Sequence, residues 1–250
     1  MRVLITGASS GIGKSMAYVY ASKGYDLVLV ARDKNKLDII KKDIKNVNVE
    51  IKICDLSNEV ACKSIYNEYR DIDILINNAG FGEVGFFEKT DLDKELNMIN
   101  TNIKAVHILT KLYLNDMIKR NSGSILNVAS IAGFLPGPLM ATYYSTKNYI
   151  VVLSESIREE LRRKKSNVKI SILCPGPVNT NFDKVANVEF SLNSLSSEYV
   201  ALYAIKKFEK GTFYIVPGLK IKLLKFFSKI IPNFLLARFV YLSQKRKKNV

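Results

Sequence analysis

Histidine and cysteine are scarce in this chain of 250 residues. The single histidine, His107, excludes a metal site built from several imidazoles, and a Ser-His-Asp triad would have to form around it. The three cysteines are scattered and include no CxxC pair, so they predict neither a disulfide framework nor an oxidising compartment. We therefore expect no metal and a cytoplasmic location.

Long apolar runs are also absent, as are acidic residues in the last part of the chain. No run of about 18 uncharged apolar residues occurs, so we expect no membrane-spanning helix. The opening MRVLITGASSGIG has the pattern of a strand and a glycine loop rather than of a signal peptide. From Gly218 to Val250 there are nine basic residues and no acidic one, within a net charge of +15. This segment needs an explanation of its own.

What the chain does contain is a regular alternation of two patterns. Short runs rich in Val, Ile and Leu alternate with helical stretches, and the predicted strands are 2–6, 26–31, 49–55, 72–80, 123–130, 167–176 and 212–216. The predicted helices include 12–23, 33–45, 57–70, 91–120, one through Tyr143, and 196–210. Such alternation favours an α/β fold with a doubly wound parallel sheet, Rossmann-like, covered on both faces. We expect one domain over 1–217, followed by a basic amphipathic helical tail over 218–250.

A glycine-rich turn, TGASSGIGKS at 6–15, joins the first strand to the first helix. Glycines there let the backbone approach a phosphate, and a helix N-terminus offers free N–H groups. A P-loop would need glycine where Ala8 stands, and the GxGxxG fingerprint does not fit the spacing GxxxGxG. A dinucleotide phosphate site is the favoured interpretation, with a glycine turn without ligand as the alternative.

The end of the second predicted strand, VARDKNKL, bears on the choice of cofactor. An acid there would bind the ribose hydroxyl of NAD, whereas a cation suits the 2′-phosphate of NADP. Ala31 takes the acid's place and Arg32 follows, which favours NADP over NAD. Asp33 complicates this choice, and a solvated Arg32 is the alternative.

The stretch TYYSTK at 142–147 places a tyrosine and a lysine four residues apart. On a helix, Tyr143 and Lys147 share a face, and Tyr144 points elsewhere. A nearby ammonium group favours the phenolate, so the pair could act as a general acid and base near neutral pH. The pair alone is also compatible with two solvated side chains.

Several motifs together resemble the short-chain dehydrogenase/reductase family. They are TGASSGIG, CDL (54–56), NNAG (77–80), Asn102, Ser130, Tyr143-xxx-Lys147 and PGPVNT (175–180), in the family's order. The resemblance covers about residues 2–216. It implies that Tyr143 is the catalytic acid/base and that Lys147 lowers its pKa and holds the nicotinamide ribose. It also implies that Ser130 binds the substrate oxygen and that Asn102 holds a relay water, while Tyr144 serves packing.

The resemblance also implies a set of cofactor-binding residues. The glycine turn would hold the phosphates, Arg32 the 2′-phosphate, Asp55 and Leu56 the adenine, and NNAG the cleft. The segment after the sixth strand would enclose the nicotinamide. The residues concerned are Gly7, Ser9, Ser10, Gly11, Ile12, Gly13, Arg32, Asp55, Leu56, Asn77, Ala79, Gly80, Tyr143, Lys147, Pro175, Gly176, Val178 and Thr180.

The expected substrate cleft is apolar. Its candidate residues, besides Ser130, are Phe81, Phe134, Leu135, Leu139, Met140 and Phe182. Few of them carry charge, which favours a hydrophobic ketone, alcohol or acyl chain. The alternative is that some of these side chains cover the core.

The tail has the pattern of two helices. Residues 221–231 alternate apolar and lysine residues, Pro232 interrupts them, and a second apolar helix leads to KRKK at 245–248. Basic amphipathic helices bind anionic membrane surfaces, so a peripheral membrane contact through 219–250 is one interpretation. A cap on the domain or a subunit contact is the other. We expect no nucleic acid partner, because apolar and aromatic residues dominate the rest of the tail.

These observations predict an NADP-dependent oxidoreductase that moves a hydride between nicotinamide and a hydrophobic carbonyl or alcohol. The alternative from another class is a non-catalytic NADP(H)-binding sensor or scaffold at a membrane surface. A nucleotide-sugar epimerase is a third option, which the short chain disfavours. The resemblance further implies a homodimer or homotetramer that pairs through the helices near 91–120 and 142–164.

Overall fold

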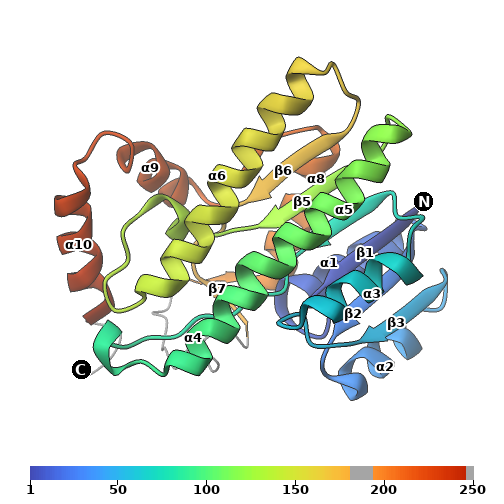
Figure 1. Ribbon diagram of the computed structural model, residues 1–250, viewed down its shortest axis with the longest axis horizontal. Helices are drawn as coiled ribbons and strands as arrows, with labels where there is room; N and C mark the ends of the chain where they lie inside the picture. Colours follow the sequence, from blue (N-terminus) through green and yellow to red (C-terminus); the bar gives the residue numbers. More distant parts are fainter. Residues whose placement is uncertain (181–193, 246–250) are drawn as a thin grey trace.

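The computed structural model of the chain describes residues 1–180 and 194–245. Its centre is a seven-stranded sheet of the order β3-β2-β1-β4-β5-β6-β9, in which every neighbouring pair is parallel (Figure 1). The strands are β1 (Arg2–Thr6), β2 (Asp26–Ala31), β3 (Val49–Ile53), β4 (Ile74–Asn77), β5 (Ser124–Val128), β6 (Lys169–Leu173) and β9 (Tyr214–Ile215). The strand order reverses between β1 and β4, which creates a crevice at their carboxyl ends. The predicted Rossmann-like fold is confirmed.

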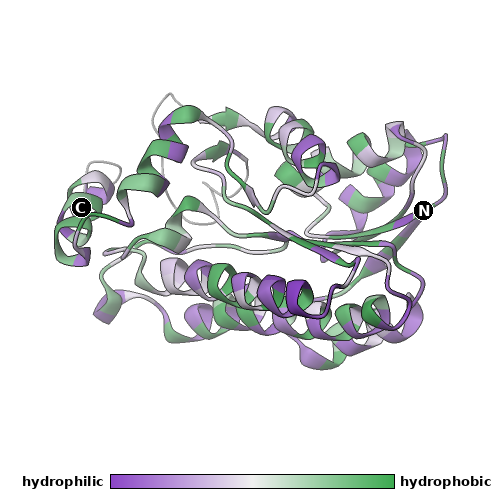
Figure 2. Ribbon diagram, turned by 90° about the horizontal axis from the view of Figure 1, so that it is seen from above, coloured by the Kyte–Doolittle hydropathy of each residue, from purple (hydrophilic) through white to green (hydrophobic). Residues whose placement is uncertain are grey.

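Helices cover both faces of the sheet, as Figure 2 shows from above. One face carries α1 (Gly11–Ser22), α2 (Lys34–Asp43) and α8 (Ser197–Glu209), and the other carries α3 (Glu59–Glu68), α5 (Val106–Lys119) and α6 (Ala141–Arg163). Strand side chains alternate between the two layers, because successive residues of a strand point to opposite faces. In β1, Val3 and Ile5 pack with the first layer and Leu4 with the second.

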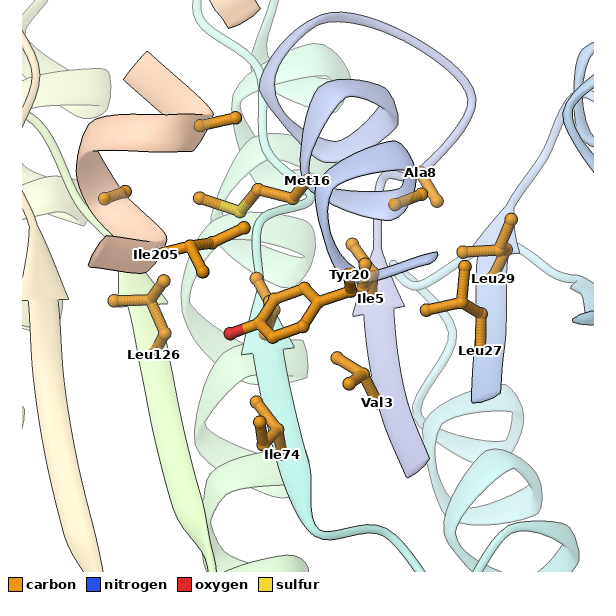
Figure 3. Close-up of a cluster of buried hydrophobic side chains, with 14 of the residues drawn as sticks. Val3, Ile5, Ala8, Met16, Tyr20, Leu27, Leu29, Ile74, Leu126 and Ile205 are labelled. Carbon is orange, nitrogen blue, oxygen red and sulfur yellow. The ribbon is translucent and has the colours of Figure 1, made fainter. Parts of the chain in front are cut away.

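Figure 3 shows the core beneath α1 and α8. Tyr20 and Met16 of α1 and Ile205 of α8 meet the sheet residues Val3 and Ile5, and all five are fully buried. Burying such a side chain stabilises the fold by about 1.5–3 kcal/mol. This packing holds the N-terminal end of α1 against the sheet, where the glycine turn lies.

The predicted long helix over 91–120 has an irregular middle. Asp91 caps α4 (Leu92–Ile99) by accepting a hydrogen bond from the Lys94 N–H at 2.7 Å. The chain then passes through a π-helical segment, η2 (Asn100–Ala105), into α5. The sequence pattern predicted one uniform helix, so this segment is a correction. A π-helical turn changes the direction of its side chains, and it contains Asn102.

The remaining elements lie beyond the carboxyl ends of the strands. They are η1 (Phe87–Lys89), η3 (Ile131–Phe134), the short pair β7 (Val178–Asn179) and β8 (Leu195–Ser196), and the tail helices α9 (Leu219–Phe227) and α10 (Asn233–Lys245). The tail helices are separated at Pro232 as predicted. They lie at the end of the molecule that the arrows of β5 and β6 point toward (Figure 1). Among the described residues, no helix is long and apolar enough to cross a membrane.

Candidate active site

A cavity of about 650 Å³ lies at the carboxyl ends of the central strands. Its lining runs from the glycine turn and Arg32, past Ser130 and Tyr143, to the tail helices. This is the position at which open α/β sheets bind ligands, and the volume is that of a site for a small molecule or cofactor.

The glycine turn is shaped for close backbone approach. Gly7, Ser9, Ser10, Gly11 and Ile12 line the cavity. Gly7 has a φ of +64°, a conformation that other residues rarely adopt. The N-cap residue of α1, Ser10, makes no side-chain cap hydrogen bond, so the first N–H groups of the helix are available to an anion.

Gly13 has a different task from the one predicted. It does not line the cavity, and it packs α1 on the strand before it. A side-chain carbon on Gly13 would come within 2.4 Å of the Gly7 carbonyl oxygen and 2.5 Å of Asn78 Nδ2. Gly13 therefore positions the turn, because only a glycine lets the helix start this close.

The far end of the cavity carries Arg32, Lys36, Asp55 and Leu56. Asp33 also lies there, but its carboxylate is engaged. It accepts from the Lys36 N–H at 3.1 Å as the cap of α2, and it pairs with Lys36 Nζ at 2.8 Å. These contacts hold the pKa of Asp33 below its usual value. Among the described residues, the exposed Arg32 guanidinium makes no ion pair or hydrogen bond and faces solvent beside the cavity.

The NNAG motif divides its tasks differently from the prediction. Asn77 does not reach the cavity: it is 2% exposed, and its amide donates to Thr110 Oγ1 at 3.0 Å and to Asn127 Oδ1 at 2.9 Å. Asn78, Ala79 and Gly80 line the cavity instead. Asn78 Nδ2 donates to the backbone oxygens of Thr6 and Gly7, which ties β4 to the glycine turn.

Tyr143 and Lys147 lie one turn apart on α6, beside Ser130 at the end of β5. All three line the cavity. Lys147 is 5% exposed, and its Nζ lies 5.8 Å from the centre of the Tyr143 ring and donates to the Val128 carbonyl at 3.0 Å. The Ser130 hydroxyl accepts from the Ala132 N–H at 3.2 Å, which fixes the side chain at the start of η3. The tyrosine, the lysine and the distant serine that the motifs contain therefore lie together in the structure.

Burial is the largest influence on the pKa values of Tyr143 and Lys147. It raises the pKa of Tyr143, and a hydrogen bond with Ser130 acts in the opposite direction. Burial also lowers the pKa of Lys147 to about 8. The resemblance implied that Lys147 lowers the pKa of Tyr143, but the net direction here is upward. The physical reason is that removal of the phenol from water penalises the phenolate.

Asn102 lies behind Tyr143 and Lys147 rather than on the cavity wall. Its side-chain amide donates to the Phe81 carbonyl at 2.9 Å and to Thr146 Oγ1 at 3.1 Å, and its Oδ1 accepts from the Phe81 N–H at 3.1 Å. Gly80 separates Asn102 from Lys147, since a side-chain carbon there would lie 3.0 Å from Asn102 Oδ1 and 3.3 Å from Lys147 Nζ. The π-helical segment aims Asn102 at this junction.

Four predicted residues after β6, Pro175, Gly176, Val178 and Thr180, line the cavity near Ser130. The predicted substrate residues separate into two groups. Phe81, Leu135 and Met140 line the cavity. Phe134 instead packs on the Tyr214 ring at 6.0 Å between centroids, and Leu139 is buried away from the cavity. Phe182 lies outside the described residues.

The sequence prediction missed the part of the wall that the tail supplies. Residues from both tail helices line the cavity: Ile221, Leu224, Phe239, Val240, Ser243 and Gln244. Tyr144, predicted to serve packing, also lines it, and its hydroxyl accepts a hydrogen bond from Gln244 Nε2 at 2.8 Å. Helical spacing of 221 with 224 and of 240 with 243 and 244 signals one face on each helix. Nothing in the sequence says which surface that face covers.

Comparison with known proteins identifies the family to which the chain belongs. The sequence profile described as short chain dehydrogenase matches residues 1–189. The human very-long-chain 3-oxoacyl-CoA reductase is 34% identical over 213 residues, which span 81% of this chain and 67% of that protein.

Two solved structures are similar to this chain over most of its length. A short-chain dehydrogenase from Sphingobium yanoikuyae, in complex with NADPH, has a TM-score of 0.82 at 30% identity and covers 87% of this chain and 88% of its own. A short-chain dehydrogenase/reductase from Burkholderia phymatum, in complex with NAD, has a TM-score of 0.81 at 25% identity and covers 90% and 91%. A doubly wound sheet with this profile defines a nucleotide-binding oxidoreductase, and the chain belongs to the short-chain dehydrogenase/reductase family.

Proposed function

We propose that the protein is an NADP-dependent reductase of hydrophobic ketones or acyl-chain carbonyls. The observation that carries the proposal is the placement of Tyr143, Lys147 and Ser130 on one continuous cavity with the glycine turn. A dinucleotide cofactor fits this cavity, because the glycine turn and the uncapped N-terminus of α1 line it at one place and Arg32 and Asp55 line it at another. When bound, a nicotinamide cofactor supplies or accepts the hydride.

The chain's own residues handle the proton and the substrate oxygen. Tyr143 donates its hydroxyl proton to the carbonyl oxygen as negative charge develops there, and Ser130 donates a hydrogen bond to the same oxygen. The raised pKa of Tyr143 keeps the phenol protonated at neutral pH, which suits reduction. Lys147 holds the ribose and, with its pKa near 8, is largely cationic at neutral pH. Asn102 positions the backbone at Phe81 and the Thr146 side chain, one residue before Lys147, through its hydrogen bonds.

The preference for NADP rests on the charge at the end of β2. Arg32 and Lys36 line the cavity there, and Asp33 is occupied by its contacts with Lys36. This arrangement leaves the Arg32 guanidinium to pair with a 2′-phosphate. Arg32→Asp should lower the ratio of NADPH to NADH efficiency by about tenfold or more, because charged hydrogen bonds contribute about 1.5–3 kcal/mol. Lys34→Ala, an exposed neighbour outside the cavity, is the matched control; an unchanged ratio in Arg32→Asp would contradict the role of Arg32.

The substrate class is inferred from the apolar part of the cavity wall. Leu135, Met140, Ile221, Leu224 and Val240 make it largely apolar. A relative that carries the name very-long-chain 3-oxoacyl-CoA reductase agrees with an acyl chain in this space. The test is the loss of NADPH absorbance over carbonyl compounds from small ketones to long-chain and steroid ketones, with NADH in parallel. Turnover on the hydrophobic compounds is expected; tight NADPH binding without any turnover would favour the sensor or scaffold instead.

A contact of the tail with an anionic membrane surface is the second part of the proposal. Large apolar side chains of the tail are exposed, among them Phe226, Ile230 and Phe234 at 60%, 64% and 72%. Four lysines lie in the same stretch, at positions 220, 222, 225 and 229. Exposed apolar groups beside cations are typical of peripheral membrane helices.

Pairing of subunits through α4, α5 and α6 is also proposed, and exposed Leu92, Leu96 and Val152 on these helices support it.

A further inference from the structure

A polar pair interrupts the apolar wall that the tail adds to the cavity. Gln244 of α10 is 5% exposed, and its Nε2 donates to the Tyr144 hydroxyl at 2.8 Å. Tyr144 lies next to Tyr143 on α6, with 6.1 Å between the two ring centroids. Both members of the pair line the cavity, and apart from Ser243 the other tail residues on the wall are apolar: Ile221, Leu224, Phe239 and Val240.

The pair is held rigidly from both sides. The Tyr144 ring lies against Gly137, where a side-chain carbon would come within 2.0 Å of the ring. On the other side, Leu236 and Val240 anchor α10 with 3% and 5% exposure. Groups that are fixed before binding lose little conformational freedom when a ligand arrives, so their hydrogen bonds contribute more to affinity.

Both side chains keep hydrogen-bond donors or acceptors that their mutual hydrogen bond does not use. Tyr144 accepts from Gln244 and keeps its own O–H to donate, and Gln244 keeps its carbonyl oxygen and a second N–H. Burial raises the pKa of Tyr144, so its hydroxyl stays protonated at neutral pH. Within residues 1–180 and 194–245, no other protein group makes a hydrogen bond to either side chain. The remaining capacity is therefore directed to whatever occupies the cavity.

We propose that Tyr144 and Gln244 form a second polar anchor of the substrate pocket. It selects carbonyl substrates that carry a further hydrogen-bonding oxygen, such as an ester, thioester or hydroxyl oxygen, a few bonds from the reacting carbonyl. The inference rests on the proposed function, since it takes the cavity beside Tyr143 as the place of the substrate. It also makes the tail part of substrate selection, because Gln244 belongs to α10.

The test compares two probes with one shared ketone position, 3-decanone and methyl 3-oxodecanoate. Their affinities for the complex of the protein with NADP⁺, which cannot reduce them, are measured by calorimetry, and their kcat/KM values are measured with NADPH. The variants are Gln244→Leu, Tyr144→Phe and the double variant. Tyr241→Phe is the matched control, because it removes a hydroxyl from α10 outside the cavity.

The wild type should prefer the ester, and each single variant should lose about tenfold of that preference, the effect of one hydrogen bond. The double variant should lose little more than the single ones, because the two residues act as a pair. The proposal is overturned if Gln244→Leu weakens both probes equally, which is the mark of a purely structural tail, or weakens neither. If the wild type reduces neither probe, the proposed function fails, and the preference in the NADP⁺ complex still decides on the anchor.

Discussion

A buried lysine at the candidate active site has a consequence for stability at high pH. Burial lowers the pKa of Lys147 to about 8, whereas the unfolded chain has the ordinary value of 10.5. Between these values the unfolded chain binds more protons than the folded one, so the contribution of Lys147 to stability rises with pH. Below about pH 8 the folded protein holds a protonated amine away from water, at a cost in free energy.

Lys147→Met removes this dependence. The free energy of unfolding of the wild type minus that of the variant should therefore rise by about 2 kcal/mol between pH 8 and pH 10. Urea unfolding of the protein without cofactor at several pH values measures it. Lys111→Met, at an exposed position of α5, controls for the loss of one charge. Parallel stability profiles for the wild type and Lys147→Met would show that burial does not perturb this amine.

Single residues also mark the limit of what the sequence predicted at the site. The motif NNAG was assigned to the cofactor cleft as a block, and the structure sends Asn77 into the core and Asn78 to the cavity. Successive residues of a strand face opposite ways, so one position decides between the two tasks. The structure brings Tyr143, Lys147 and Ser130 to one cavity, because each stands at the start of a helix or at the end of a parallel strand.

At the scale of elements, the glycine turn depends on how closely α1 approaches β1. Gly13→Ala would place a carbon against the Gly7 carbonyl and Asn78, neither of which can move freely. The free energy of unfolding of the variant should be about 1–3 kcal/mol lower than that of the wild type. The variant should also bind NADPH more weakly, because the turn is displaced. Denaturant unfolding and a cofactor titration measure both effects.

Gly85→Ala is the matched control for this variant. Its added carbon would approach a single side-chain group, the Thr90 methyl at 2.9 Å, and no backbone atom. Equal losses of stability in the two variants would contradict the packing task given to Gly13.

Two elements show why sequence patterns alone do not predict the whole site. The hydrophobic pattern over 91–120 does not distinguish α-helical from π-helical turns, and the π-helical segment at Asn102 depends on contacts with Phe81 and Thr146 far along the chain. The tail helices and their break at Pro232 follow from local rules. Their position over the cavity depends on tertiary packing, for example of Ile221 against Gly176, where a side-chain carbon would come within 2.5 Å.

At the scale of the whole molecule, the sheet and its crevice follow from the sequence, because alternating strands and helices permit few topologies. The tail joins the cavity wall on one side and exposes large apolar side chains to solvent. Deletion of the tail would therefore open the cavity as well as remove the proposed membrane contact, so point variants are the better test.

Phe226→Glu, Ile230→Glu and Phe234→Glu, made separately, should each weaken binding to vesicles of phosphatidylserine and phosphatidylcholine by about tenfold. Added salt should weaken wild-type binding, since lysines contribute. Co-sedimentation measures both. Val60→Glu, which alters an exposed apolar residue of α3, is the control. If the wild type binds the vesicles and all three tail variants bind them equally well, the membrane contact lies elsewhere.

The catalytic assignment is tested most directly by Tyr143→Phe, measured as NADPH oxidation with the best hydrophobic carbonyl substrate and, in parallel, as NADPH affinity. The variant keeps the ring and loses the proton donor, so kcat should fall by about 10²–10⁴-fold while cofactor binding stays nearly unchanged. Tyr199→Phe, on the exposed surface of α8, should behave as the wild type. Substantial residual turnover in Tyr143→Phe would contradict the account, because no proton would then need to come from Tyr143.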